Sequence, residues 1–253
     1  MQSSSLPEII PVFPLTGIML LPGMWLPLHI FEPRYRHMIA DAVGVAEDSW
    51  GGAGKPANNP TAPEPVREDA TGVIGMVQPL VPRQDNRPSP EALANPHPEE
   101  PELYTVGCVG RIERWERTPD GRYAIALKGV SRFRITGELP LLKGYRRVRA
   151  SYDEFKGDTL ESDPSYDPSR LMAALDCWKR GKSLPMAFGE LRKLHGLAAL
   201  NTLAMSLPLA PVEKQALLEA PTHVEREKLL LELLEMGIEE RGETGNVTPP
   251  KSN

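Results

Sequence analysis

The stretch Leu28-His-Ile-Phe-Glu-Pro-Arg-Tyr, residues 28–35, predicts a strand that passes directly into a helix. The strand covers Trp25–Phe31 and is interrupted by Pro27. A proline has no N–H for a ladder, so this strand is expected at the edge of a sheet or at a bulge. Pro33 suits the first turn of the following helix. Apolar residues at helical spacing then predict about three turns, at Tyr35, Met38, Ile39 and Ala42.

Short apolar runs separated by proline and glycine extend this strand into a sheet. The turn Thr118-Pro-Asp-Gly121 joins two of them as a hairpin, with proline and glycine where such a turn favours them. After the turn, apolar residues alternate with polar or small ones, which is typical of a strand. The predicted strands are Glu8–Phe13, Trp25–Phe31, Val73–Val77, Val106–Trp115, Arg122–Leu127, Val130–Ile135 and Tyr145–Tyr152.

Helical spacing replaces this pattern near residue 165. Asp167-Pro168 predicts a helix start, and Phe188–Leu207 predicts a buried helix because it is apolar over most of its circumference. A short helix follows at Pro211–Glu219, and Thr222–Glu225 fits a capping box that opens a last helix. The sequence therefore predicts an α+β protein with three parts, namely a β-rich domain over residues 1–160, an α-helical bundle over 161–242 and a flexible tail over 243–253.

Two segments of the β-rich part differ from the rest in composition. Residues 44–70 are rich in glycine, alanine, proline and asparagine, and residues 82–101 contain six prolines. Neither has enough apolar surface to offset the entropy lost on ordering. Both are predicted to be surface loops inserted into the β-rich domain.

The composition excludes several classes of protein. Only two cysteines, Cys108 and Cys177, occur in 253 residues, too few for a disulfide framework or a four-cysteine zinc site. The most apolar N-terminal stretch, Ile9 to Ile30, contains four prolines, so it fits neither a signal peptide nor a membrane span. A cytoplasmic protein without a membrane partner is expected.

The sequence contains no recognisable catalytic constellation. Its five histidines are dispersed, and none has a cysteine or carboxylate at metal-ligand spacing. Lys182-Ser183 resembles the end of a phosphate-binding loop, but it ends a predicted helix where that motif opens one. No catalytic residue, cofactor or metal ligand is predicted.

Positive charge is concentrated in the predicted sheet. Val106–Ala150 contains eleven Lys or Arg and four Asp or Glu, a local charge of +7 in a chain whose net charge is −5. One interpretation is a basic face for nucleic acid or an acidic protein segment. The other is a solvated sheet face paired with acidic helices of the second domain.

Three segments together resemble one family. They are Pro11–Leu15 with Leu28–Tyr35, then Val106–Ile112 with Leu127–Ile135, and finally Leu203–Leu209 with Glu213–Glu219. The order of these segments and their residues are similar to those of the amino-terminal, substrate-binding domain of the ATP-dependent Lon protease in its stand-alone bacterial form. The resemblance extends from about Ile9 to Leu234.

This resemblance implies a six-stranded β-domain related to the PUA-like pseudo-barrels, followed by a helical bundle. In the family this domain is thought to engage polypeptide substrates, while later domains carry ATP hydrolysis and peptide cleavage. The sequence ends at Asn253 without the phosphate loop or the Ser–Lys proteolytic pair. The expectation is a non-enzymatic module that binds an unfolded or specific polypeptide and could serve a separate protease. The alternative is RNA or other nucleic acid bound through the basic sheet, since PUA-like folds include RNA binders.

The family motif also suggests which residues are structural. Phe31 is expected to plug the barrel, Pro33 to start the helix and Tyr35 to pack beneath it, with Gly129 and Phe133 forming a second structural motif. Phe133 and Ile135 are expected in the core.

Five residues are the candidates for binding a partner. His29 lies in an apolar strand, and Glu32 and Arg34 could form a charged contact at the strand-to-helix corner. Arg132 and Arg134 share one strand face, opposite Phe133. Arg132 is expected to dock against an acidic residue of the helical domain and Arg134 to be exposed.

Overall fold

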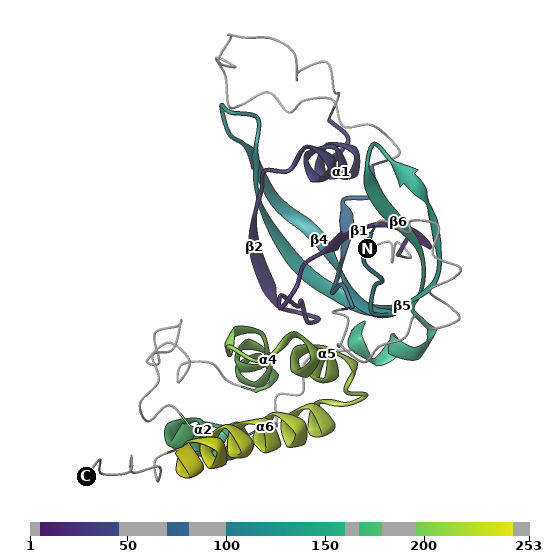
Figure 1. Ribbon diagram of the computed structural model, residues 1–253. Coiled ribbons are helices and arrows are strands. Elements are labelled where there is room, and N and C mark those ends of the chain that lie inside the picture. Colours follow the sequence, from purple (N-terminus) through teal and green to yellow (C-terminus); the bar gives the residue numbers. More distant parts are fainter. Residues whose placement is uncertain (1–5, 46–69, 81–99, 160–166, 179–195, 245–253) are drawn as a thin grey trace, which may run out of the picture. The chain divides into compact units, whose positions relative to one another are not determined.

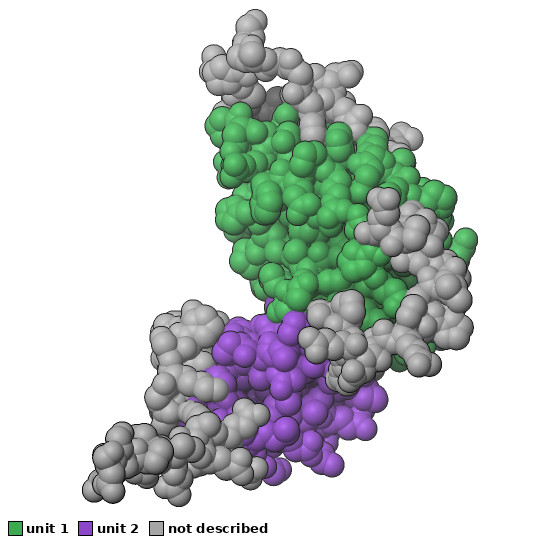
Figure 2. Space-filling model, in the orientation of Figure 1, with its two compact units in different colours: residues 1–160 green, residues 161–253 purple. Residues whose placement is uncertain are grey.

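A computed structural model describes residues 6–45, 70–80, 100–159, 167–178 and 196–244 (Figure 1). The predicted loops 44–70 and 82–101 fall almost wholly outside these ranges, as do residues 188–195 and most of the predicted tail. The chain divides into two compact units, residues 1–160 and 161–253 (Figure 2).

A six-stranded sheet forms the first unit. Its strand order is β2-β5-β4-β3-β1-β6, and β5 also pairs with β6, which closes five of the strands into a barrel and leaves β2 beside β5. All pairings are antiparallel except that of β1 with β3. The predicted edge position of the strand carrying Pro27 is therefore confirmed. The strands are β1 (Ile9–Pro14), β2 (Trp25–Ile30), β3 (Val73–Val77), β4 (Val106–Arg117), β5 (Tyr123–Leu142) and β6 (Tyr145–Ser151).

β5 is one strand of 20 residues where the sequence predicted two. Gly129 lies at the position of the predicted break, but the strand continues through it, and the chain around Leu21 crosses there at close range. A Cβ atom on Gly129 would lie 2.1 Å from the Leu21 carbonyl oxygen. Gly129 thus admits a backbone crossing, which agrees with the structural role expected of it.

Phe133 fills the barrel, and Phe31 does not. The Phe133 side chain is fully buried, and Cβ atoms added at Gly75 and Gly107 would lie 2.9 and 2.7 Å from the tip of its ring. These two glycines therefore make room for the ring. The expectation that Phe31 plugs the barrel is wrong, because its side chain is 63% exposed. The residues packed around Phe133 are Ile10, Val12, Val73, Val77, Val109, Val148 and Ala150, with Ile135 partly buried against them.

The strand-to-helix corner has the predicted form. Helix α1 (Pro33–Val43) begins at Pro33 and ends at Gly44, which adopts φ 77°. Tyr35 is buried, and its ring centroid lies 4.3 Å from that of Phe13 on β1. The Tyr145 hydroxyl donates to Asp41 at 2.9 Å, which ties the helix to β6.

Four helices form the described part of the second unit: α2 (Ser169–Trp178), α4 (Leu197–Ser206), α5 (Pro211–Glu219) and α6 (His223–Thr244). The capping box is confirmed, because the Thr222 side chain accepts from Glu225 N–H and Thr222 N–H donates to the Glu225 carboxylate, both at 3.2 Å. The buried Arg226 donates to Asn201 Oδ1 at 3.1 Å and to the Leu217 carbonyl at 2.9 Å. With the six-stranded sheet of the first unit, these helices confirm the α+β class.

Candidate binding surface

Glu32 and Arg34 form the predicted charged contact. Arg34 Nε donates to Glu32 at 3.1 Å, and its Nη1 donates to Glu100 at 2.7 Å. The guanidinium carbon also lies 4.6 Å from the centroid of the Tyr35 ring. Both charges are therefore engaged within the first unit, where they brace the strand-to-helix corner.

Arg132 pairs with a residue of its own unit. Its side chain is buried, and its backbone N–H, Nε and Nη2 donate to the Asp158 carboxylate at 2.8, 2.9 and 2.8 Å. Asp158 belongs to a 3₁₀ helix, η3 (Asp153–Thr159), which follows β6. The expected acidic partner belonged to the helical domain, whereas this carboxylate belongs to the first unit, which folds it over the strand.

Arg134 is half-exposed and is also paired. Its Nη2 donates to Glu154 of η3 at 2.7 Å, and the two side chains are 40% and 53% exposed. The hydrogen bond from Arg134 lowers the pKa of the Glu154 carboxyl. Along β5, Arg132 lies eight residues beyond Ala124, the partner of His29, which corresponds to about 26 Å of strand. The five candidate residues thus fall in two separate places.

His29 belongs to a stripe of exposed side chains on β2. Trp25, Pro27 and His29 are exposed, whereas Leu28 and Ile30 point into the core. Phe31 continues the exposed set directly after the strand. The period of two that governs a strand therefore places Phe31 outside. The same alternation is visible in the sequence, so counting from Leu28 and Ile30 would have predicted the stripe.

Small residues lie beside this stripe on β5. Pro27 and His29 pair with Ala126 and Ala124, and Trp25 pairs with Lys128, whose Nζ lies 5.8 Å from the Trp25 ring centroid. On the next strand, Arg114 and Glu116 pair with the two alanines. Directly paired residues share a face of the sheet, so these side chains form one surface. We call it the outer face; it consists of Trp25, Pro27, His29, Phe31, Ala124, Ala126, Lys128, Arg111, Arg114 and Glu116.

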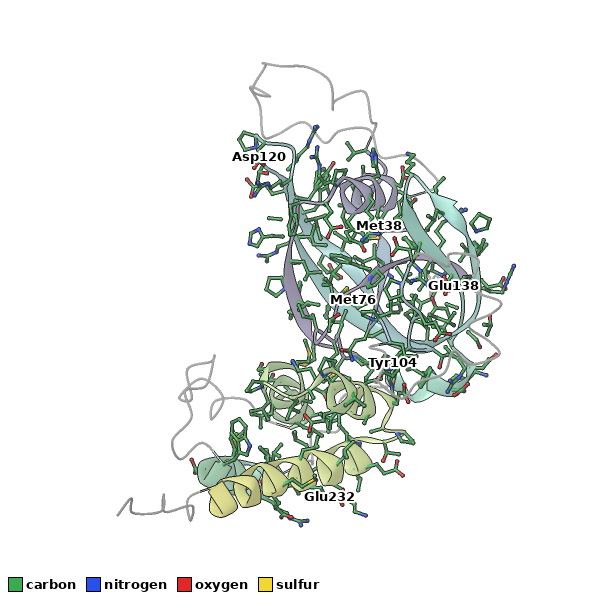
Figure 3. The ribbon with its side chains drawn as sticks, in the orientation of Figure 1. Met38, Met76, Tyr104, Asp120, Glu138 and Glu232 are labelled. Atoms are coloured by element: carbon green, nitrogen blue, oxygen red, sulfur yellow. The ribbon has the colours of Figure 1, made fainter. Side chains whose placement is uncertain are left out.

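A cleft of about 390 Å³ opens at one end of this face, between the end of β2 and the β4–β5 hairpin turn. Figure 3 shows Asp120 at the tip of that hairpin. Asp120 accepts from the Thr118 hydroxyl and lies 3.0 Å from Arg122 Nε, and the hydrogen bond from Thr118 lowers the pKa of its carboxyl. The cleft therefore offers aromatic and proline surface beside an ion pair. Its lining residues are His29, Phe31, Thr118, Pro119, Asp120, Arg122 and Tyr123.

Most of the positive charge noted in the sequence is matched within the first unit. The second interpretation placed the acidic partners in the helical domain, whereas six ion pairs between described residues join these cations to carboxylates of the first unit. Such pairing reduces the field available to a polyanion. The pairs are Arg122–Asp120, Arg132–Asp158, Arg134–Glu154, Lys143–Asp41, Arg146–Glu138 and Arg149–Glu8.

The described ranges contain neither a metal-binding cluster nor a helix that could span a membrane. No cluster of three or more His, Cys, Asp or Glu side chains there could hold a metal ion. None of the helices in the same ranges is both long and apolar enough to cross a membrane.

The sequence is similar to the substrate-binding domains of Lon proteases over nearly its whole length. Residues 9–236 match the model of the ATP-dependent protease La (LON) substrate-binding domain. The chain is 27% identical over 238 residues to Lon protease 2 of Myxococcus xanthus and 26% identical to the Lon protease of Anaeromyxobacter dehalogenans. Each match covers 92% of this chain and 24% of the relative, so the chain spans about a quarter of their length.

A solved structure shares the fold. The crystal structure of a Lon N-terminal domain protein from Xanthomonas campestris superposes with a TM-score of 0.51 at 20% identity, covering 88% of this chain and 97% of that one. The family match extends over nearly the whole sequence, from β1 into α6. This chain belongs to the family of Lon protease substrate-binding domains.

Proposed function

We propose that this chain is a non-enzymatic module that binds polypeptide, either an unfolded segment or a specific protein partner, through the outer face. The observation that carries the proposal is the exposed stripe on β2, in a domain of a substrate-binding family. Trp25 is 50% exposed and Phe31 63% exposed. Large aromatic side chains held in contact with water are typical of recognition surfaces.

The composition of the outer face supports a polypeptide ligand. Tryptophan and phenylalanine each bury about 150–250 Å² when fully covered, so covering the exposed halves of both removes a substantial apolar area from water. Arg114, Glu116 and Lys128 add charged side chains along the margin of this apolar stripe, on the side of β5 and β4. An apolar centre with a charged rim is the usual composition of a protein-binding patch.

The nucleic-acid alternative stays a prediction, and the ion pairs within the first unit argue against it. The salt dependence of the binding constant K distinguishes it from polypeptide binding. Each phosphate neutralised on a single strand contributes about −0.7 to the slope of log K against log salt. A polypeptide held mainly by apolar contacts has a much flatter dependence. The module could pass its bound polypeptide to a separate protease, whether that polypeptide is unfolded or a specific partner.

Titration of the purified protein tests the proposal. The ligands are a permanently unfolded polypeptide, such as reduced and carboxymethylated α-lactalbumin, a broad peptide array and a single-stranded RNA. We expect saturable polypeptide binding with Kd below roughly 100 µM, a free energy of about −5.5 kcal/mol. Absence of such binding across the whole set would refute the proposal, and steep salt-dependent binding of RNA alone would favour the alternative.

Matched variants locate the surface. Trp25→Ser and Phe31→Ser are expected to weaken polypeptide binding at least tenfold, because each removes an exposed anchor. Leu141→Ser is the control, since Leu141 is also an exposed apolar residue of the barrel, at 41%, but lies near the other end of β5. Equal losses in all three variants would contradict the assignment to the outer face.

A further inference from the structure

We propose that the free edge of β2 pairs with an extended segment of the bound polypeptide, which adds a strand to the sheet and places a large apolar side chain in the cleft beside Phe31. This inference rests on the proposed function and specifies how the ligand is held. It commits to one kind of occupant, a strand in which large apolar residues alternate with polar and acidic ones.

In the described part of the chain, β2 has a partner strand on one side only. β2 stands at one end of the strand order, where β5 is its partner among the described strands. Gly129 N–H donates to the Met24 carbonyl at 2.8 Å, next to the first residue of β2. In an antiparallel pair, hydrogen-bonded and non-bonded residues alternate. The backbone groups of Leu26, Leu28 and Ile30 therefore face β5, and those of Trp25, Pro27 and His29 face away from it.

Pro27 occupies one of the outward positions. A proline there removes no ladder hydrogen bond to β5, because its missing N–H would have pointed away from that strand. The outward edge consequently offers N–H donors at Trp25 and His29, and carbonyl acceptors at Trp25, Pro27 and His29. The missing N–H at Pro27 also makes the edge selective, because a proline limits indiscriminate pairing with other strands.

The cleft lies where an added strand can reach it. His29 and Phe31 line the cleft and also belong to the exposed stripe beside the free edge. A diagonal neighbour on an added strand lies about 7–8 Å away, within the reach of an aromatic side chain. A volume of about 390 Å³ is enough to accept such a ring. Phe31 and Pro119, which both line the cleft, would then cover the two faces of the inserted ring.

Charge complementarity selects the remaining side chains of the segment. The outer face and the cleft present Arg111, Arg114, Arg122 and Lys128 against Glu116 and Asp120. The balance is positive, so acidic residues between the apolar ones are favoured over basic ones.

The test uses the unaltered protein and a blocked nonapeptide in which Phe or Val alternates with Thr or Asp. Single N-methylation of each peptide residue removes one backbone donor at a time. Because only every second N–H of an added strand points to β2, methylation is expected to weaken binding about tenfold at alternate positions and less than twofold at the positions between. Uniform tolerance of methylation, with the parent peptide still bound, would overturn the added strand while leaving the proposed function intact.

Hydrogen exchange of β2 provides an independent readout. The amides of Leu26, Leu28 and Ile30 are expected to be protected with or without the peptide, whereas those of Trp25 and His29 become protected only on binding. Unchanged exchange at Trp25 and His29 under saturating peptide contradicts the added strand. Absence of binding by both the nonapeptide and the unfolded polypeptide would overturn the inference and the proposed function together.

A pair of peptides tests the placement of the apolar side chain in the cleft. Replacing the central Phe of the peptide by Ala is expected to weaken binding at least tenfold to the unaltered protein and only slightly to Phe31→Ala, because the two rings contact each other. Replacing the Asp residues by Lys is expected to weaken binding severalfold. Equal losses from the peptide Phe→Ala change in both proteins would refute the placement of that side chain in the cleft.

Discussion

Removal of the Asp158 carboxylate is expected to destabilise the first unit strongly, although Asp158 lies outside the barrel strands. Its carboxylate accepts three hydrogen bonds from Arg132, one of them from the backbone N–H of β5. The two side chains are only 5% and 10% exposed. Asp158→Ala therefore leaves a buried guanidinium and a buried N–H without this acceptor.

The size of the loss follows from that burial. Removing one partner of a buried ion pair costs about 3–5 kcal/mol, because the remaining charge stays out of water. With an m-value near 2 kcal/mol/M, the urea midpoint should fall by roughly 1.5–2.5 M. Arg132→Met in the same molecule should recover much of the loss, since an apolar side chain removes the stranded charge and can still pack on Phe155, whose ring centroid lies 4.8 Å from the Arg132 guanidinium carbon.

Arg134 and Glu154 are the matched control. This pair joins the same strand to the same 3₁₀ helix but is exposed, so Glu154→Ala should leave the urea midpoint nearly unchanged. Urea unfolding is followed by tryptophan fluorescence in the single and double variants. Strictly additive effects of Asp158→Ala and Arg132→Met, or equal losses at Asp158 and Glu154, would refute the reasoning.

Three further outcomes follow from the packing. Gly107→Ala should destabilise the first unit by about 1–3 kcal/mol, because the new Cβ would lie 2.6 Å from the Met76 carbonyl oxygen. Gly137→Ala is the control: a Cβ there has no atom within 4 Å, so the same urea assay should show a neutral or slightly stabilising effect. Burial raises the pKa of Tyr152 to about 12 from 10.0. The unfolded chain therefore releases a proton between pH 10 and 12 that the native state keeps, so stability should fall as pH rises through this range, and less steeply in Tyr152→Phe. Thr222→Ala should cost the second unit about 0.5–2 kcal/mol through loss of the cap on α6, measured by helical circular dichroism, and a loss as large as that of Asp158→Ala would contradict this account.

Local sequence signals predicted the elements that depend on neighbouring residues. Pro33 opens α1, the Thr118–Gly121 turn joins β4 to β5, and the Thr222–Glu225 box caps α6 because each signal acts within a few residues. The edge position of β2 also followed from a local fact, the missing N–H of Pro27. The α+β class rests on such signals together.

Other features depend on contacts between distant residues. The partner of Arg132 could not be read from the sequence, because Asp158 is 26 residues away and reaches it only when η3 folds over β5. The close approach of the chain near Leu21 to Gly129 joins residues far apart in the sequence, which no local pattern records. The position of Phe31 is different, because a local signal does exist: Leu28 and Ile30 face the core, so the alternation of β2 places Phe31 outside and also predicts the outer face.

The position of β1 within the sheet has a consequence for the order in which the first unit folds. β1 comes first in the sequence, yet it lies between β3 and β6, and its Ile9 pairs with Arg149. During synthesis the side of the strand that pairs with β6, from Ile9 to Val12, must wait without this partner until β6 has left the ribosome. The β4–β5–β6 meander consists of consecutive strands and can form at once. The earliest strand made is therefore the last to be enclosed, and the nascent chain passes through a stage in which its N-terminal segment is open to capture by chaperones or to aggregation.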